Sequence, residues 1–246
     1  AKLHLRLNLQ TFLPSFAVIE EGAHHDSSRM MALCAGLQRG EIAVFDKAYV
    51  HFEHLFTLNK QGVFWVTRAK DNMRYHVCKK RKASGNTLRD DEITLKTKKS
   101  KEHYPSRLRR IVARVEVDGK TTEMVFITNN MDWAASSVCD LHQSRWAIEV
   151  FFKQIKQTLQ ICDFLGHSKQ AIRWQLWSVL LLYVLLRFQA WSSDWPHSFA
   201  RLFTMIRSLV WDRFDLSDTL RFYGTAGDKW RMCIQPQTAY LPELAP

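Results

Sequence analysis

The segment between Val63 and Asn130 constrains the fold more than any other part of the sequence. It contains short runs rich in β-branched and aromatic residues, such as VFWVTRAK and TEMVFITN, separated by turn residues such as Ser84-Gly85-Asn86 and Asp118-Gly119. Successive runs without helices between them predict antiparallel strands, because parallel strands need long crossover connections. An all-helical fold is therefore excluded, and we expect a twisted antiparallel insertion here.

The two flanking regions combine short strands with helices. Leucines at alternate positions predict a strand over Lys2–Leu9, and a second strand over Ser15–Glu20 forms a hairpin with it. The remaining expected elements are a helix from Asp26 or Ser27 to about Leu37, a strand over Glu41–Phe45, a helix from Phe52 to Lys60, and helices from Trp133 to Leu165 and from Ser168 to Leu220. Together these elements predict an α/β class with helices packed on a mixed sheet.

The charge balance indicates a polyanionic partner. The 246 residues include 35 Lys+Arg against 24 Asp+Glu, which gives a net charge of +11. Nucleic acid is the first candidate, and an anionic membrane surface is the second. An apolar content of 46% excludes a disordered chain. Five cysteines without a C-x-x-C pair, and no signal peptide in KLHLRLNL, favour a reducing cytoplasm.

One apolar stretch, Leu176–Leu186, is bounded by arginines. It is shorter than the roughly 20 apolar residues that span a bilayer. We therefore expect a buried core helix and no membrane partner. The tryptophans around it, Trp174, Trp177 and Trp191, are expected to be core residues rather than a platform for stacked bases.

The predicted helix from His142 to Lys156 carries the strongest candidate site. Residues spaced three or four apart lie on one face of a helix. Those residues are His142, Arg145, Glu149, Lys153 and Lys156. One interpretation is a solvated face with i,i+4 ion pairs; the other is a carboxylate that binds a metal ion, flanked by cations that hold the phosphates of a DNA strand.

Asp46 is the second candidate. It stands at the carboxyl end of the short apolar strand EIAVF, where open α/β sheets collect ligands. The alternative is a turn residue or a helix-entry aspartate.

Together the two elements resemble the DDE transposases of the insertion-sequence-four family. The family signature is Tyr, two residues, Arg, three residues, Glu, six residues, Lys, and Arg145, Glu149 and Lys156 stand at those spacings. The run FDKAYVHF followed by FWVTRAKDN is similar to the block around the family's second aspartate, which corresponds to Asp46. The segments KLHLRLNL and FAVIEEGAHHDS are similar to the stretch between the family's first and second catalytic aspartates. The resemblance extends to about Gln189 and implies an RNase H-like core interrupted by a β-rich insertion.

The resemblance also implies roles for individual residues. Asp46 and Glu149 become two of the three catalytic, metal-binding carboxylates, and carboxylate oxygens suit Mg²⁺ or Mn²⁺. Arg145 and Lys156 become contacts to the DNA near the scissile phosphate, and His142 and Lys153, on the same helix face, are further expected DNA-binding positions. The implied divisions are 1–62 for the first part of the core, 63–130 for the insertion, 131–165 for the glutamate helix and 166–246 for a C-terminal helical region.

Three departures from the family pattern matter. His142 replaces the signature tyrosine, and Ala48 replaces a usual glycine after Asp46. The first aspartate belongs to a strand just before KLHL, so we expect this chain to lack one catalytic carboxylate. Asp26 is better explained as a helix cap.

The implied activity is cleavage of DNA at transposon ends and transfer of the strands into target DNA, in a bacterial cytoplasm and within a synaptic homodimer. One alternative is a catalytically dead DNA-binding remnant, and another is a metal-dependent nuclease of unrelated origin. Basic residues of the insertion are expected either to bind DNA or to form a solvated surface. They are Lys79, Lys80, Arg81, Lys82, Lys96, Lys98, Lys99 and Lys101.

Two histidine groups are weaker candidates. His51 and His54 are expected to be surface residues, because no third metal ligand is evident in the sequence. The group His24-His25-Asp26 is expected to be polar residues at a helix entry.

Overall fold

The computed structural model describes residues 2–20, 26–117, 119–161, 164–166, 168–211 and 216–222. His24, His25 and the predicted turn residue Asp118 lie outside these ranges. The chain divides into two compact units. The first comprises Ala1–Leu9 and Ser15–Ile148, and the second comprises Gln10–Pro14 and Glu149–Pro246.

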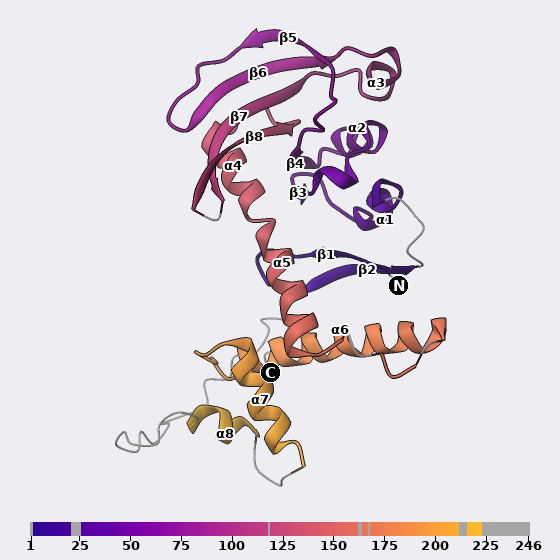
Figure 1. The fold of residues 1–246 in the computed structure, drawn as a ribbon, viewed down its shortest axis with the longest axis vertical. Helices are drawn as coiled ribbons and strands as arrows, with labels where there is room; N and C mark the ends of the chain where they lie inside the picture. Colours follow the sequence, from indigo (N-terminus) through magenta and orange to yellow (C-terminus); the bar gives the residue numbers. More distant parts are fainter. Residues whose placement is uncertain are drawn as a thin grey trace. The chain divides into compact units, whose positions relative to one another are not determined.

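A six-stranded mixed sheet is the centre of the first unit (Figure 1). Its strand order is β3-β4-β8-β7-β6-β5. The strands are β3 (Ile42–Phe45), β4 (Phe64–Arg68), β5 (Tyr75–Lys80), β6 (Thr87–Leu95), β7 (Leu108–Val117) and β8 (Lys120–Thr128). Every neighbouring pair from β4 to β5 is antiparallel, as the sequence predicts.

The pairing of β3 with β4 differs from the prediction. We expected the run beginning at Val63 to open an antiparallel insertion, but β4 is parallel to β3. The helix α2 (Phe52–Lys60) connects the two strands, so β3, α2 and β4 form a βαβ unit. Gly62, which follows the end of α2, has a φ of 74°, a conformation that glycine adopts without steric cost.

Alternate residues of the strands pack into two cores on opposite faces of the sheet. On β4, Trp65 belongs to one core and Val66 to the other. The first core includes residues of α1 (Met30–Leu33) and α2, and Tyr104, which directly follows α3 (Lys98–His103). The second core is closed by α4 (Ala135–Gln143) through Val138. Helices on both faces of a mixed sheet confirm the predicted α/β, RNase H-like class.

The predicted N-terminal hairpin strands form a separate two-stranded sheet in the first unit. They are β1 (Lys2–Leu7) and β2 (Pro14–Glu20). The helix expected to reach Leu37 is shorter: the 3₁₀ turn η1 (Asp26–Arg29) precedes α1, which ends at Leu33. Gly36, with a φ of 79°, lies in the turn that follows.

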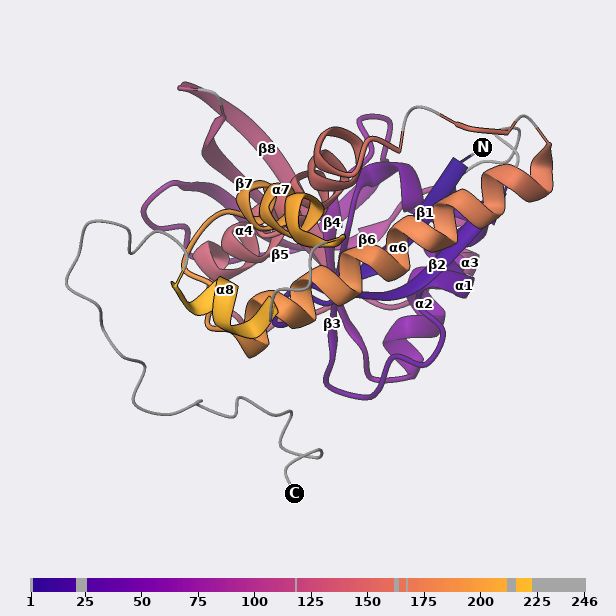
Figure 2. The same cartoon turned by 90° about the horizontal axis from the view of Figure 1, so that it is seen from below.

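The second unit is helical, as predicted. The helix α5 (Trp146–Lys153) enters it at Glu149 and continues as the π-helical turn η3 (Gln154–Thr158). Its other helices are α6 (Lys169–Ser192), α7 (Phe199–Leu209) and α8 (Leu216–Phe222) (Figure 2). Buried Tyr183 of α6 is central: its hydroxyl donates to the Phe12 carbonyl at 3.1 Å, and its ring lies 4.7 Å from Phe151 and 5.2 Å from Phe199.

The helix α6 corrects the prediction of a buried core helix. Trp174, Trp177 and Trp191 are 66%, 50% and 40% exposed, so they are not core residues. Only one face, with Leu176, Leu180, Tyr183 and Leu186, is buried. Among the described helices, α6 alone has the length and apolar composition that a bilayer crossing needs, although soluble core helices also meet that test. The prediction that this segment is too short to span a bilayer considered only the apolar run Leu176–Leu186, whereas α6 extends from Lys169 to Ser192.

Candidate active site

Asp46 directly follows β3, at the end of the sheet where β3 and β4 both finish. It caps the 3₁₀ turn η2 (Lys47–Tyr49), and its Oδ1 accepts a hydrogen bond from the Ala48 backbone N–H at 3.3 Å. The side chain is 43% exposed. Asp46 therefore does cap a turn, but its carboxylate still reaches solvent and other ligands. Ala48 has no positive φ, so the departure from glycine leaves this turn unstrained.

The structure brings Arg145 to Asp46. The Nη1 atom of Arg145 lies 3.8 Å from Oδ2 of Asp46, although the two residues are far apart in the sequence. Arg145 is more buried than Asp46, which restricts its guanidinium group. The two positions taken from separate sequence blocks therefore meet in one unit of the fold.

The helix that carries Arg145 is not continuous. The helix α4 ends at Gln143 and α5 begins at Trp146, with Arg145 in the turn between them. The Ser144 hydroxyl donates to the Leu141 carbonyl at 2.6 Å, a local bond of the kind that bends helices. The prediction of one uninterrupted helical face from His142 to Lys156 is therefore wrong, because a turn at Ser144 and Arg145 separates α4 from α5.

His142 lies on the buried side of α4. It is 7% exposed, and its ring is 4.9 Å from that of Phe126. Burial, followed by the charges of Arg145 and Arg68, lowers the pKa of His142 to about 4, although Asp46 acts in the opposite direction. His142 is therefore neutral near pH 7. Its predicted contact with a DNA phosphate stays a prediction.

The low pKa of His142 makes the stability of the first unit depend on pH. Between about pH 6.5 and pH 4 the unfolded chain binds a proton that the folded chain does not, so the free energy of unfolding falls as the pH falls. We expect a loss of about 2 kcal/mol from pH 7.5 to pH 5. Urea unfolding at both pH values measures it. The same pH-dependent loss in His142→Gln would contradict the assignment.

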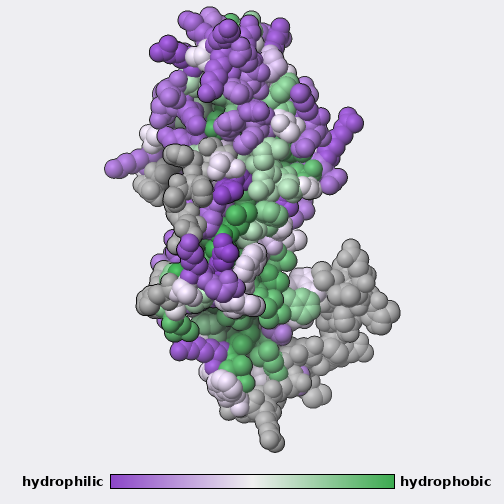
Figure 3. All heavy atoms as spheres, turned by 90° about the vertical axis from the view of Figure 1, so that its right-hand side faces the viewer, coloured by the Kyte–Doolittle hydropathy of each residue, from purple (hydrophilic) through white to green (hydrophobic). Residues whose placement is uncertain are grey.

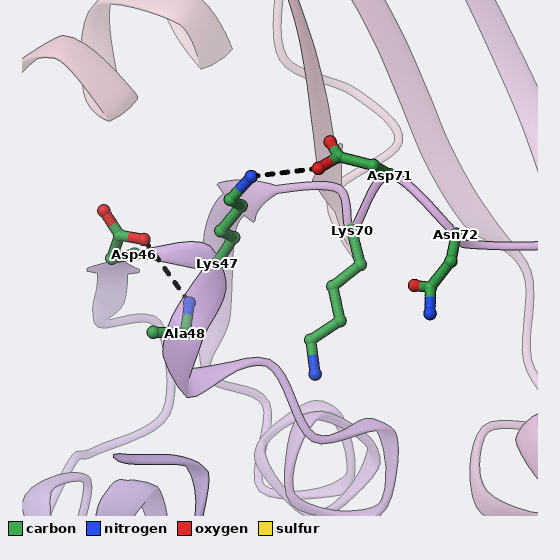
Figure 4. A pocket seen from close by; sticks show the side chains of 6 residues that line it. All are labelled: Asp46, Lys47, Ala48, Lys70, Asp71 and Asn72. Atoms are coloured by element: carbon green, nitrogen blue, oxygen red, sulfur yellow. Dashed lines mark hydrogen bonds and ion pairs between the residues drawn. The ribbon is translucent and has the colours of Figure 1, made fainter. Parts of the chain in front are cut away.

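A hollow of about 520 Å³ opens beside Asp46 (Figure 4). Its lining comes from η2 and from the loop after β4: Asp46, Lys47, Ala48, Lys70, Asp71 and Asn72. Lys47 Nζ and Asp71 Oδ2 are 3.1 Å apart and bridge the two segments. The sequence analysis missed Lys70 and Asp71. Recognising β3 and β4 as a parallel pair would have placed them, because residues after parallel strands meet at one edge.

Buried His4 connects η2 to the N-terminal sheet. Its Nδ1 is 2.9 Å from the Tyr49 hydroxyl, and its Nε2 is 3.1 Å from Glu20 Oε1. His4 is 1% exposed, and Glu20 also forms an ion pair with Arg29. This buried network fixes the end of the turn that Asp46 begins, so β1 and β2 contribute indirectly to the position of Asp46.

Glu149, Lys153 and Lys156 belong to the second unit. All three side chains are exposed, whereas Phe151 and Ile155, on the same segment, are buried. Exposed polar and buried apolar side chains are thus separated as expected for an amphipathic segment. Lys156 lies in the π-helical turn η3, a type of turn frequent at functional sites.

The carboxylate of Asp46 is the type of ligand that a hard divalent cation prefers. Asp46 offers exposed oxygen atoms, which Mg²⁺ and Mn²⁺ prefer, and the cation Arg145 lies beside one of them. Within the described ranges, no three His, Cys, Asp or Glu side chains are grouped so that they could hold one ion. Asp46 is therefore a candidate ligand, and further ligands must complete its site.

The fold and this site define an RNase H-like α/β core with an aspartate at a strand end beside an arginine from a later turn. The family model described as Transposase DDE domain matches residues 1–185, and the chain belongs to that family. The predicted family resemblance is thereby confirmed.

Three relatives show how far this similarity extends. A protein named as transposase y4zB of Sinorhizobium fredii is 28% identical over 88% of this chain and 61% of its own length. A protein named as the transposase of IS5377 from Geobacillus stearothermophilus is 30% identical over 76% and 48%. Transposase InsG of IS4 from Escherichia coli is 27% identical over 60% and 34%. The chain thus spans between about a third and three-fifths of these relatives' lengths.

Proposed function

We propose that this chain is the catalytic region of a DNA transposase that cleaves DNA at transposon ends and transfers the strands into target DNA. The observation that carries the proposal is the meeting of Asp46 and Arg145 at the end of β3, in a chain of the DDE family. Divalent metal ions supply activation of the attacking oxygen and stabilisation of the leaving oxygen when they are bound.

Within this proposal, Asp46 and Glu149 hold the metal ions, and Arg145 orients Asp46 and approaches a phosphate. Lys153 and Lys156, exposed on α5 and η3, hold the DNA backbone near the scissile phosphate. Cleavage replaces the bond between phosphorus and the 3′ oxygen with a bond to water and leaves a 3′-hydroxyl. In strand transfer that hydroxyl loses its proton and attacks a target phosphodiester, the bond between the target phosphorus and its own 3′ oxygen breaks, and the released 3′ oxygen takes up a proton from solvent.

The second candidate is a DNA-binding remnant without catalytic activity. The net charge of +11 supports DNA binding without requiring cleavage. The catalytic proposal also includes a cytoplasmic location and a homodimer in the synaptic complex.

The test uses the complete reading frame that contains this chain, with duplexes that carry the terminal sequences of its element and Mg²⁺. Sequencing the locus upstream of the Ala1 codon defines that frame. Metal-dependent nicks at the ends and joined products support a transposase. DNA binding without nicks supports the remnant, and nicks without joining support an unrelated nuclease.

Part of the predicted basic surface is engaged in internal ion pairs. Arg81 lies within 4.0 Å of Asp90 and 3.9 Å of Glu92, and Lys79 is 3.8 Å from Glu92. Lys80 and Lys82 are exposed. Figure 3 shows mainly hydrophilic side chains on the visible face at the end of the first unit that carries α3. We therefore assign DNA binding to the exposed lysines rather than to Arg81.

Reversing the charges of Lys80 and Lys82 is expected to make the negative slope of log affinity against log salt shallower by about 2, because each lost phosphate contact removes about 0.9 from its magnitude. Fluorescence anisotropy with a labelled duplex at several salt concentrations measures the slope. Lys120→Glu, an exposed reversal on β8, is the control. An unchanged slope in the Lys80→Glu, Lys82→Glu variant would mean that this surface is only solvated.

A further inference from the structure

A stripe of large apolar side chains runs along one exposed face of α6. Its members are separated by three or four residues, a spacing that keeps side chains on one face of a helix. Each is at least 48% exposed, and together they form what we call the α6 stripe: Trp174, Trp177, Leu181, Leu185 and Phe188. The opposite face carries the buried side chains of α6, which are Leu176, Leu180, Tyr183 and Leu186. The second unit therefore covers only one of two apolar faces.

The area of the α6 stripe is large for a surface that stays in water. An aromatic side chain presents about 150–250 Å², so the exposed parts of the five side chains amount to on the order of 600 Å². Monomeric soluble proteins rarely expose contiguous apolar patches above a few hundred Å², and larger patches mark interaction surfaces. A standard interface covers about 800 Å² on each partner. The stripe thus has the size of the apolar centre of such an interface, which a polar rim completes.

The spacing of the α6 stripe fits a second helix. Separations of three, four, four and three residues average three and a half, the repeat with which two helices pack along each other. The helix is unbroken over the whole stripe (Figure 2). On the other face of α6, Tyr183 contacts Phe151 and Phe199, so α6 is held firmly in the second unit. A stripe presented on a fixed helix loses little conformational freedom when it binds.

A second copy of α6 matches the stripe when the two helices run antiparallel. With Leu181 at the two-fold axis, Trp174 lies opposite Phe188 of the second copy. Trp177 then lies opposite Leu185 of the second copy, so every member of the stripe meets an apolar side chain. The same patch is used on both chains, and such an arrangement closes as a dimer.

Charge favours the antiparallel arrangement over the parallel one. Arg173, which directly precedes the stripe, faces Gln189 of a second copy in the antiparallel arrangement, but another Arg173 in the parallel one. Like charges placed against each other weaken an interface. We propose that the α6 stripe is the interface of an antiparallel homodimer that forms without DNA. This dimer does not depend on the proposed transposase activity.

Sedimentation velocity of the 246-residue chain, freed of nucleic acid and measured over a range of concentrations, tests the dimer. We expect a reversible dimer that high salt does not weaken, since salt screens charges but not apolar contacts. Leu181→Lys should weaken dimerisation at least about 30-fold, the loss typical of a central interface residue. Lysine is a good helix former, and circular dichroism checks that the variant is folded. Val77→Lys, at an exposed apolar position on β5, is the matched control and should dimerise normally.

A mixing experiment tests the antiparallel register. Trp177→Lys and Leu185→Glu should each weaken self-association, because each places a charge in an apolar interface. An equal mixture of the two variants should regain the dimer, since the introduced lysine of one chain then faces the introduced glutamate of the other. A mixture that stays monomeric would overturn the antiparallel arrangement.

Three further results would overturn the proposal. An unaltered chain that stays monomeric, or a dimer that persists in folded Leu181→Lys, would show that the α6 stripe is not the interface. A monomer that floats with phosphatidylcholine vesicles, and loses this binding in Leu181→Lys, would assign the stripe to a lipid surface. The protein expressed from the complete reading frame is measured in the same way. If it is monomeric while the 246-residue chain dimerises, the rest of its own chain covers the stripe.

Discussion

Glu149→Gln is expected to reduce the proposed strand cleavage by at least about 100-fold in the protein expressed from the complete reading frame, while DNA affinity changes little. Loss of groups that merely support a metal ligand already costs 10–100-fold, and a direct ligand should cost no less. The amide is nearly isosteric with the carboxylate, so folding should be preserved. Cleavage of a labelled transposon-end duplex in Mg²⁺, with affinity measured in parallel, checks this expectation.

Asp46→Asn should give a similar loss, because it removes the negative charge that Arg145 faces at 3.8 Å. Glu123→Gln, an exposed change on β8, is the matched control and should retain full cleavage. Cleavage within a few-fold of the unaltered protein in either Glu149→Gln or Asp46→Asn would refute the metal-ligand role of that residue.

Asp90→Ala is expected to lower the free energy of unfolding of the first unit by about 3–5 kcal/mol. Asp90 and Arg109 are buried neighbours on β6 and β7, joined by two hydrogen bonds of 2.9 Å and 2.7 Å. Arg109 also donates to the Trp133 carbonyl. Removing the carboxylate leaves a buried guanidinium without its counter-charge. Urea unfolding followed by circular dichroism at pH 7.5 measures the loss.

The double variant Asp90→Leu with Arg109→Met separates the cost of an unpaired charge from the value of the pair. A buried ion pair replaced by apolar residues is often close to neutral, so the double variant should be more stable than Asp90→Ala. Asp71→Asn, which breaks an exposed pair with Lys47, should change stability by less than about 1 kcal/mol. If Asp90→Ala lowered the free energy of unfolding by less than about 1 kcal/mol, the stabilising role of the buried pair of Asp90 and Arg109 would be contradicted.

The sequence was sufficient where the signal was local. Alternating leucines predicted a strand over Lys2–Leu9, where β1 ends two residues earlier, and the strand predicted over Ser15–Glu20 lies within β2. The helix predicted over Phe52–Lys60 matches α2 residue for residue. Asp46 was found because a short apolar strand ends immediately before it. Arg145 and Glu149 were found because their separation along the sequence matches the family signature. The break between α4 and α5 was missed, since the Ser144 hydroxyl there forms a bond that a periodic pattern does not encode. The length of α1 was also missed, because the predicted helix ran through Gly36, which adopts a positive φ in the turn after α1.

Contacts between distant residues were decided only by the tertiary structure. The parallel pairing of β3 with β4 placed Lys70 and Asp71 beside Asp46, and the packing of α3 near α2 placed His103 beside His51. Neither follows from periodicity, because strand partners and helix neighbours are chosen by how the buried faces fit together. The sequence by itself determined most of the elements and the family. The fold determined which side chains meet, since burial and proximity depend on the whole packed unit.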